Sequence, residues 1–240
     1  MTSTVLAGAI TIVAFAGFLR GVTGFGGAMM ITPLLSILAG PVPAVVIALI
    51  LETSAALVMF ADAIPKARWK VLSYLTIPTI FTVPLGGYLL LTLDPLLARK
   101  VIAIVVIVCS AALLFGIRYS GHPRPVTSIV LGSIVGAMLG ATSVGAPPVI
   151  LYLLSGPDPA AITRANLTIF VTTISVIGLV MLAVAGAITA KLALIAAFLV
   201  APFLLATWLG GKLFTRLNDA VARRIALGLM MAAGVISLVS

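Results

Sequence analysis

The chain has 240 residues, of which 62% are hydrophobic and only 8% are charged, a composition that excludes an ordinary water-soluble domain. Fourteen Lys and Arg against five Asp and Glu give a net charge of +9, but no basic run is interleaved with aromatic residues, which argues against a nucleic-acid partner. The sequence therefore predicts an integral membrane protein in contact with lipid, with its positive charges in short loops.

Apolar runs bounded by charges, glycines and prolines predict ten helical elements. They cover residues 2–20, 26–39, 43–63, 69–92, 96–117, 126–140, 146–154, 160–187, 191–211 and 220–239. The second and seventh fall short of the roughly 20 helical residues needed to cross a hydrocarbon core. We therefore expect an all-α, polytopic transmembrane helical bundle of about eight full spans plus broken or re-entrant half-helices.

An internal repeat divides the chain into two halves. Residues 17–36 are identical at eight of twenty positions to the residues 119 further on, and GPVPA at 40–44 returns as GPDPA at 156–160. At an offset of 124, the Gly-Gly pair at 86–87 returns at 210–211. The sequence thus predicts a first membrane repeat at 1–117, a cytoplasmic linker at 118–125 and a second membrane repeat at 126–240.

The positive charges predict that the two repeats have inverted topology. Each repeat has five elements, an odd number, so the second half must enter the membrane from the opposite side. Lys66, Arg68 and Lys70 crowd the loop after the third element, whereas the second half concentrates its charges at 212–224. Because short cytoplasmic loops collect Lys and Arg, both termini should lie outside the cytoplasm. Inverted repeats are typical of secondary transporters, although duplication could also have produced a larger membrane scaffold.

Two glycine-rich stretches interrupt the helical pattern at matching places, GVTGFGG at 21–27 and GATSVGAPP at 140–148. Glycine destabilises a continuous helix, and the half-helix after each break would present unpaired amides and a positive dipole end. Since helix N-termini bind anions, the two breaks predict an oxyanion site. Its expected residues are Thr23, Gly24, Gly26, Gly27, Thr142, Ser143, Gly145, Ala146 and Pro147.

The glycines upstream of the breaks favour a different role. They follow the small-xxx-small spacing that lets two transmembrane helices touch. These residues are Gly17 and Gly21 in the first half and Gly132, Gly136 and Gly140 in the second. We expect them to pack helix against helix, and the glycines inside the breaks to contact the ligand.

Two ionisable residues fall within or beside the apolar elements. Glu52 lies near the middle of the third element, where a carboxyl group is a candidate for proton or ion coupling. The alternatives for Glu52 are a buried neutral carboxyl or an ion pair with Arg20 or Arg164. Arg20 borders the first break and either faces the substrate as a fixed cation or extends to the membrane interface. A polar strip on the eighth element either lines a path or bonds helix to helix; it comprises Asn166, Thr168, Thr172 and Thr173.

The sequence lacks the groups that other membrane functions need. Its one histidine, His122, lies in the linker, and its one cysteine, Cys109, is isolated, so we expect no enzyme, no metal site and no cofactor. No GxxxxGK[ST] loop for ATP occurs. An anion channel and a non-transporting scaffold remain alternatives to a transporter, and homo-oligomerisation is left open.

The motif GVTGFGGAMMITPLL followed by GPVPA, repeated as GATSVGAPPVILYLL and GPDPA, resembles the TauE/SafE family of sulfite exporters. The resemblance extends over nearly the whole chain. Ala28 replaces a glycine of the first family motif, and the stretch at 145–148 stands where the family often has a glycine triplet. The resemblance implies a multi-pass permease of the bacterial inner membrane that moves sulfite, an organosulfonate or a related small anion, coupled to an ion gradient.

Overall fold

The computed structural model describes residues 3–116, 124–156, 158–214 and 219–240, and these residues are almost entirely helical. In chain order the helices are α1 (Ser3–Thr23), α2 (Gly27–Ala39), α3 (Pro41–Ala63), α4 (Trp69–Thr92), α5 (Pro95–Leu114), α6 (Pro125–Thr142), α7 (Ala146–Leu153), α8 (Ala160–Val184), α9 (Ala190–Phe214) and α10 (Asp219–Val239). A 3-10 turn, η1 (Ile64–Lys66), follows α3, and no β-strand occurs in the described ranges. The all-α fold expected from the sequence is confirmed.

Eight of the described helices are long and apolar enough to cross a membrane: α1, α3, α4, α5, α6, α8, α9 and α10. By contrast, α2 has 13 residues and α7 has 8. At about 1.5 Å per residue, neither short helix reaches across a hydrocarbon core of about 30 Å. The expected combination of eight long spans and two half-helices is therefore confirmed.

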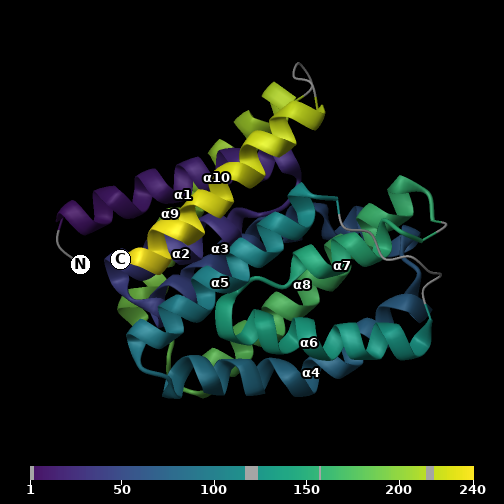
Figure 1. The fold of residues 1–240 in the computed structure, drawn as a ribbon, viewed down its shortest axis with the longest axis horizontal. Coiled ribbons are helices and arrows are strands. Elements are labelled where there is room, and N and C mark those ends of the chain that lie inside the picture. The colour runs from purple at the N-terminus through teal and green to yellow at the C-terminus, as the bar shows by residue number, and fades with distance from the viewer. Residues whose placement is uncertain (1–2, 117–123, 157, 215–218) are drawn as a thin grey trace.

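The helix packing keeps the same pattern when the two halves are exchanged. The pair of α1 and α9 corresponds to the pair of α6 and α4, and the contact of α2 with α10 corresponds to that of α7 with α5. Two further pairs join equivalent helices of the two halves, α3 with α8 and α5 with α10. Figure 1 shows α4 and α6 side by side along one edge of the molecule, with both chain termini at one end. This exchange symmetry is consistent with two inverted repeats; most of the linker expected between them, 118–123, lies outside the described residues.

Glycines bring the paired helices into backbone contact. Gly21 of α1 faces the backbone at 210–211 of α9, and Gly140 of α6 faces the backbone at 86–87 of α4. A Cβ atom at either glycine would overlap a carbonyl oxygen of the partner helix. The predicted packing role is confirmed at both positions. It is confirmed in the same way for Gly17 and Gly132, and for Gly136 by close approach to the Thr82 hydroxyl and the Thr79 Cα of α4.

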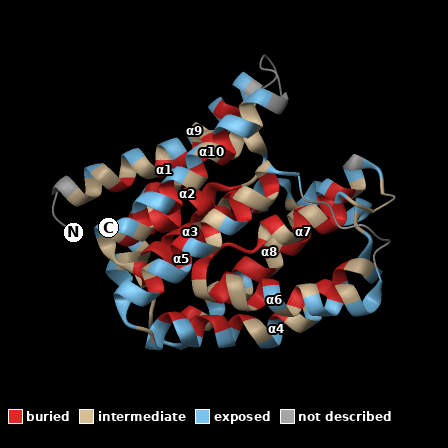
Figure 2. Ribbon diagram, viewed as in Figure 1, coloured by how far each residue is buried: buried red, intermediate tan, exposed pale blue. Residues whose placement is uncertain are grey.

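Helix α3 lies at the centre of the bundle. Buried residues concentrate in the middle of the molecule (Figure 2), and 61% of the most apolar window of the α3 span is buried, against 22–39% for the other seven spans. The outer helices α4 and α9 expose large apolar side chains, as surfaces in contact with lipid do. These include Phe81, Leu85, Phe198 and Leu205. Glu52 on α3 is consequently held at the centre, among buried residues.

Candidate functional site

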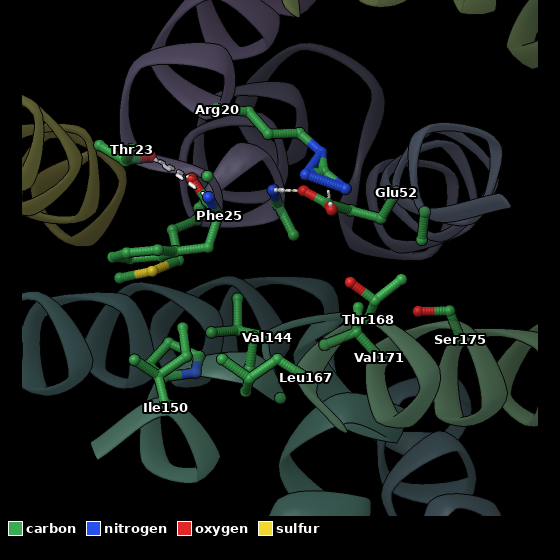
Figure 3. A pocket seen from close by; sticks show the side chains of 18 of the residues that line it. Arg20, Thr23, Phe25, Glu52, Val144, Ile150, Leu167, Thr168, Val171 and Ser175 are labelled. Carbon is green, nitrogen blue, oxygen red and sulfur yellow. Dashed lines mark hydrogen bonds and ion pairs between the residues drawn. The ribbon is translucent and has the colours of Figure 1, made fainter. Parts of the chain in front are cut away.

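A cavity of about 420 Å³ lies between the two halves. Its lining includes residues from both helix breaks, from α3 and α8, and from the start of α10. Figure 3 shows the first half supplying one wall and the second half facing it. The first wall carries Arg20, Thr23, Phe25 and Glu52, and the facing wall carries Val144, Ile150, Leu167, Thr168, Val171 and Ser175. A charged wall therefore faces one that is mostly apolar, with hydroxyl groups.

The first break separates α1 from α2 between Thr23 and Gly27. Gly24 has a φ of 79° and Gly26 a φ of 89°, a left-handed conformation that glycine adopts without a steric cost. The Thr23 hydroxyl oxygen lies 2.8 Å from the Leu19 carbonyl oxygen and 2.5 Å from that of Phe25. The hydroxyl therefore donates to the backbone of the break and helps to fix its shape.

The second break repeats part of this geometry at an offset of 119 residues. Helix α6 ends at Thr142, whose hydroxyl donates to the Met138 carbonyl at 2.7 Å and accepts the Val144 amide at 3.2 Å. Ser143 stands in the place of Gly24 and has a φ of 61°, the one positive φ among the described non-glycine residues. The two breaks therefore share a left-handed residue after the long helix, but they differ directly before the half-helix, where Gly26 has a φ of 89° and Gly145 a φ of −124°.

A hydroxyl pair joins the two halves beside the cavity. Thr32 Oγ1 on α2 lies 2.6 Å from Ser143 Oγ in the second break, and both residues are buried. Because Ser143 Oγ also donates to the Thr142 carbonyl at 2.5 Å, Thr32 is the donor in this pair. The bond ties the half-helix of the first repeat to the break of the second.

The Glu52 carboxylate occupies the N-terminus of α2. Its Oε1 accepts the Ala28 amide at 2.8 Å, and its Oε2 lies 3.2 Å from Arg20 Nε. Ala28 is the second residue of α2, so its amide has no partner inside the helix and is one of the groups that attract anions. Glu52 is 8% exposed, and the Arg20 side chain 12%. Of the two ion-pair partners considered for Glu52, the structure selects Arg20.

Gly27 makes room for this carboxylate. A Cβ atom at Gly27 would lie 2.5 Å from Glu52 Oε1 and 3.3 Å from Arg20 Cδ. The first distance is far below an ordinary van der Waals contact, so a larger residue would push the carboxylate away from the Ala28 amide. Gly27 thus influences the cavity through Glu52.

A family model described as "Sulfite exporter TauE/SafE" matches residues 9–236. The chain belongs to the TauE/SafE sulfite exporter family. No match was found among curated proteins or among solved structures. Membership of this transporter family, together with eight apolar helices, identifies a multi-pass membrane transporter.

Most of the predicted site residues of this TauE/SafE protein line the cavity. They are Arg20, Thr23, Gly24, Gly26, Glu52, Ser143, Gly145, Ala146 and Pro147. Gly27 and Thr142 are not part of the lining; Gly27 contacts Glu52, and Thr142 bonds to the backbone of the second break. That these residues bind the transported anion stays a prediction.

The two breaks of the TauE/SafE protein offer an anion unequal surroundings. Pro147 and Pro148 are the second and third residues of α7, and proline has no N–H, so only Gly145 and Ala146 can present amides at that helix end. The ion pair of Arg20 and Glu52 also has no counterpart in the second half. In the repeat alignment, Leu139 stands where the first half has Arg20 (offset 119), and Thr168 stands where it has Glu52 (offset 116, from the GPVPA and GPDPA motifs).

The structure adds cavity residues that the sequence interpretation did not assign to a site. Arg223, at the start of α10, lines the cavity, with its guanidinium carbon 5.4 Å from the centroid of the Phe25 ring. Arg164, at the start of α8, lines it too and is exposed. The signal for Arg223 was the cluster of positive charge at 212–224, which the sequence interpretation used for topology only.

The four residues of the polar strip on α8 make different contacts. Thr168 lines the cavity. Asn166 instead accepts the Arg68 amide at 2.8 Å, which fixes the connection between α3 and α4 against α8. Thr172 and Thr173 donate to carbonyl groups of their own helix at 2.7 and 2.8 Å.

Proposed function

We propose that this TauE/SafE protein is a secondary transporter that moves a small oxyanion, such as sulfite or an organosulfonate, across the bacterial inner membrane. A proton or ion gradient drives the transport, with Glu52 as the coupling residue. The observation that carries the proposal is the buried pair of Arg20 and Glu52 at the N-terminus of α2, inside the cavity between the two halves.

The first wall of the cavity has the groups that recognise an oxyanion. Arg20 is a fixed cation, and the α2 N-terminus adds an amide and a positive dipole end. Arg20 Nε is buried and, within the described part of the chain, has only the 3.2 Å ion pair with Glu52, which does not meet hydrogen-bond geometry. A guanidinium with unused donor capacity in a cavity supports binding of an oxygen-rich anion.

The facing wall supports a substrate with a small apolar part. Val144, Leu167 and Val171 are apolar, while the Thr168 and Ser175 hydroxyls lie on the same wall. A volume of about 420 Å³ is within the range of small-molecule sites and exceeds the needs of a bare oxyanion. An organosulfonate would place its charged head at Arg20 and its carbon chain against this wall.

The position of the remaining cavity arginines supports access from one side. Arg164 and Arg223 lie at the starts of α8 and α10, the helix ends that the distribution of positive charge assigns to the cytoplasm. We infer that this conformation is open to the cytoplasm. Movement of one half against the other would then open the cavity to the opposite side, as in other inverted-repeat carriers.

Radioactive sulfite flux into proteoliposomes tests the proposal, with an organosulfonate and sulfate as competitors. We expect saturable flux that an Arg20→Gln substitution abolishes and that Arg224→Gln, an exposed arginine outside the cavity lining, leaves unchanged. Flux that rises linearly with concentration would indicate a channel. Equal flux in empty liposomes and in proteoliposomes would refute a transport function for these anions.

A further inference from the structure

We propose that the Glu52 carboxylate is the resident occupant of the anion site, and that the substrate anion replaces it only when Glu52 takes up a proton. Anion and proton would then cross the membrane together. This inference rests on the function proposed above, since it requires that an oxyanion is the substrate.

The geometry of Glu52 is that of a tethered anion in an anion site. One carboxylate oxygen accepts the Ala28 amide at 2.8 Å, and the other lies 3.2 Å from Arg20 Nε. A substrate oxyanion would seek the same two groups, because a helix N-terminus and a guanidinium both favour negatively charged oxygen. The substrate and the ionised carboxylate therefore compete for one position.

Charge balance links this competition to the proton. In the resident state, Arg20 and ionised Glu52 cancel each other. A proton from water in the cavity neutralises Glu52 and frees its place, and a singly charged anion then restores the balance with Arg20. The site at Arg20 has no net charge when it holds either ionised Glu52 or the substrate anion. A buried arginine without either partner is unfavourable in low-dielectric surroundings. On release of the anion, Glu52 returns its proton to water and binds Arg20 again.

The neighbouring groups limit the exchange to a single proton. Glu52 is the only carboxylate among the described residues that line the cavity, and the repeat alignment places Thr168 at the equivalent position of the second half. Besides Glu52 and Arg20, the charged residues of the cavity lining are the arginines Arg164 of α8 and Arg223 of α10. Helix α9 contributes the uncharged Phe203 beside Gly27. The stoichiometry expected is one proton with each singly charged anion.

The experiment uses methanesulfonate, which keeps a single negative charge at every pH of interest, in proteoliposomes of the purified protein. A pH gradient alone, with the outside more acidic than the inside, should drive accumulation of methanesulfonate in the proteoliposomes. A potassium diffusion potential at equal pH should not, because the anion and the proton that cross together have no net charge. Glu52→Gln should lose the gradient-driven accumulation yet retain exchange of internal for external methanesulfonate, a readout that an unfolded protein could not give. Asp62→Asn, an exposed carboxylate on the same helix, is the matched control and should behave as the unchanged protein.

Several outcomes would overturn the inference. Accumulation driven by the membrane potential alone, or unchanged gradient-driven accumulation in Glu52→Gln, would show that Glu52 does not carry the proton. If Glu52→Gln lost exchange as well, the coupling would be tested in the unchanged protein with a pH-sensitive dye inside the proteoliposomes. Efflux of the anion without a matching movement of protons would contradict the coupling. Proteoliposomes that move sulfite but show none of this coupling would leave the proposed transport of an oxyanion intact and would refute the coupling role of Glu52. Absence of flux for both anions would refute that function and this inference with it.

Discussion

Substitution of Gly27 by alanine is the most direct perturbation of the Glu52 position. The added Cβ would lie 2.5 Å from Glu52 Oε1, so the carboxylate must retreat by about 0.9 Å to reach an ordinary contact of 3.4 Å. Movement away from α2 lengthens the 2.8 Å bond to the Ala28 amide to about 3.7 Å, which is no longer a hydrogen bond. A hydrogen bond to a charged group contributes about 1.5–3 kcal/mol, and a loss of this size is expected in the free energy of unfolding.

A double-mutant cycle with Glu52→Gln separates this loss from simple crowding. Crowding against Phe203, 3.1 Å from the added Cβ, persists in both backgrounds, whereas the charged bond exists only with Glu52. We expect a coupling energy of about 1 kcal/mol or more from chemical unfolding in detergent. Gly27→Ala should also lower the apparent affinity for methanesulfonate, because the added Cβ crowds the position at the Ala28 amide for which the substrate and the carboxylate compete. Additive effects on stability together with unchanged affinity would refute the reasoning.

Three further predictions follow from the packing and the charges. Gly21→Ala forces apart the contact between α1 and α9 and should destabilise the protein by about 2 kcal/mol or more in thermal unfolding, whereas Gly228→Ala, with open space around its Cβ, should be neutral or stabilising. Thr32→Val removes the donor to Ser143 and should cost about 0.5–1.5 kcal/mol of unfolding free energy, with equal melting curves counting against the bond. Arg223→Gln should raise KM for sulfite severalfold and flatten its salt dependence at nearly constant kcat, and a fall in kcat alone would contradict a role in attracting the anion.

The sequence by itself determined the helices, the breaks and their repetition. Inside a bilayer the backbone must satisfy its own hydrogen bonds, so long apolar runs become helices and the break positions follow from local residues. The observed helix ends at Thr23 and Thr142 fall inside the expected breaks at 21–27 and 140–148, and they differ by the 119 residues of the repeat. The close-packing role of Gly21 and Gly140 was likewise readable from their spacing.

Only the tertiary structure decided which groups meet at the cavity. The sequence left Glu52 with Arg20 or Arg164 as its partner, and the tertiary structure places Arg20 Nε 3.2 Å from Glu52 Oε2. It could not show that the Ala28 amide, 24 residues from Glu52, would be bonded by this carboxylate. Nor could it bring Arg223 from α10 to the same cavity. Local hydropathy sets where a helix begins and ends, but the partner of a polar side chain depends on how separate helices rotate and cross, and close packing of small residues sets that geometry.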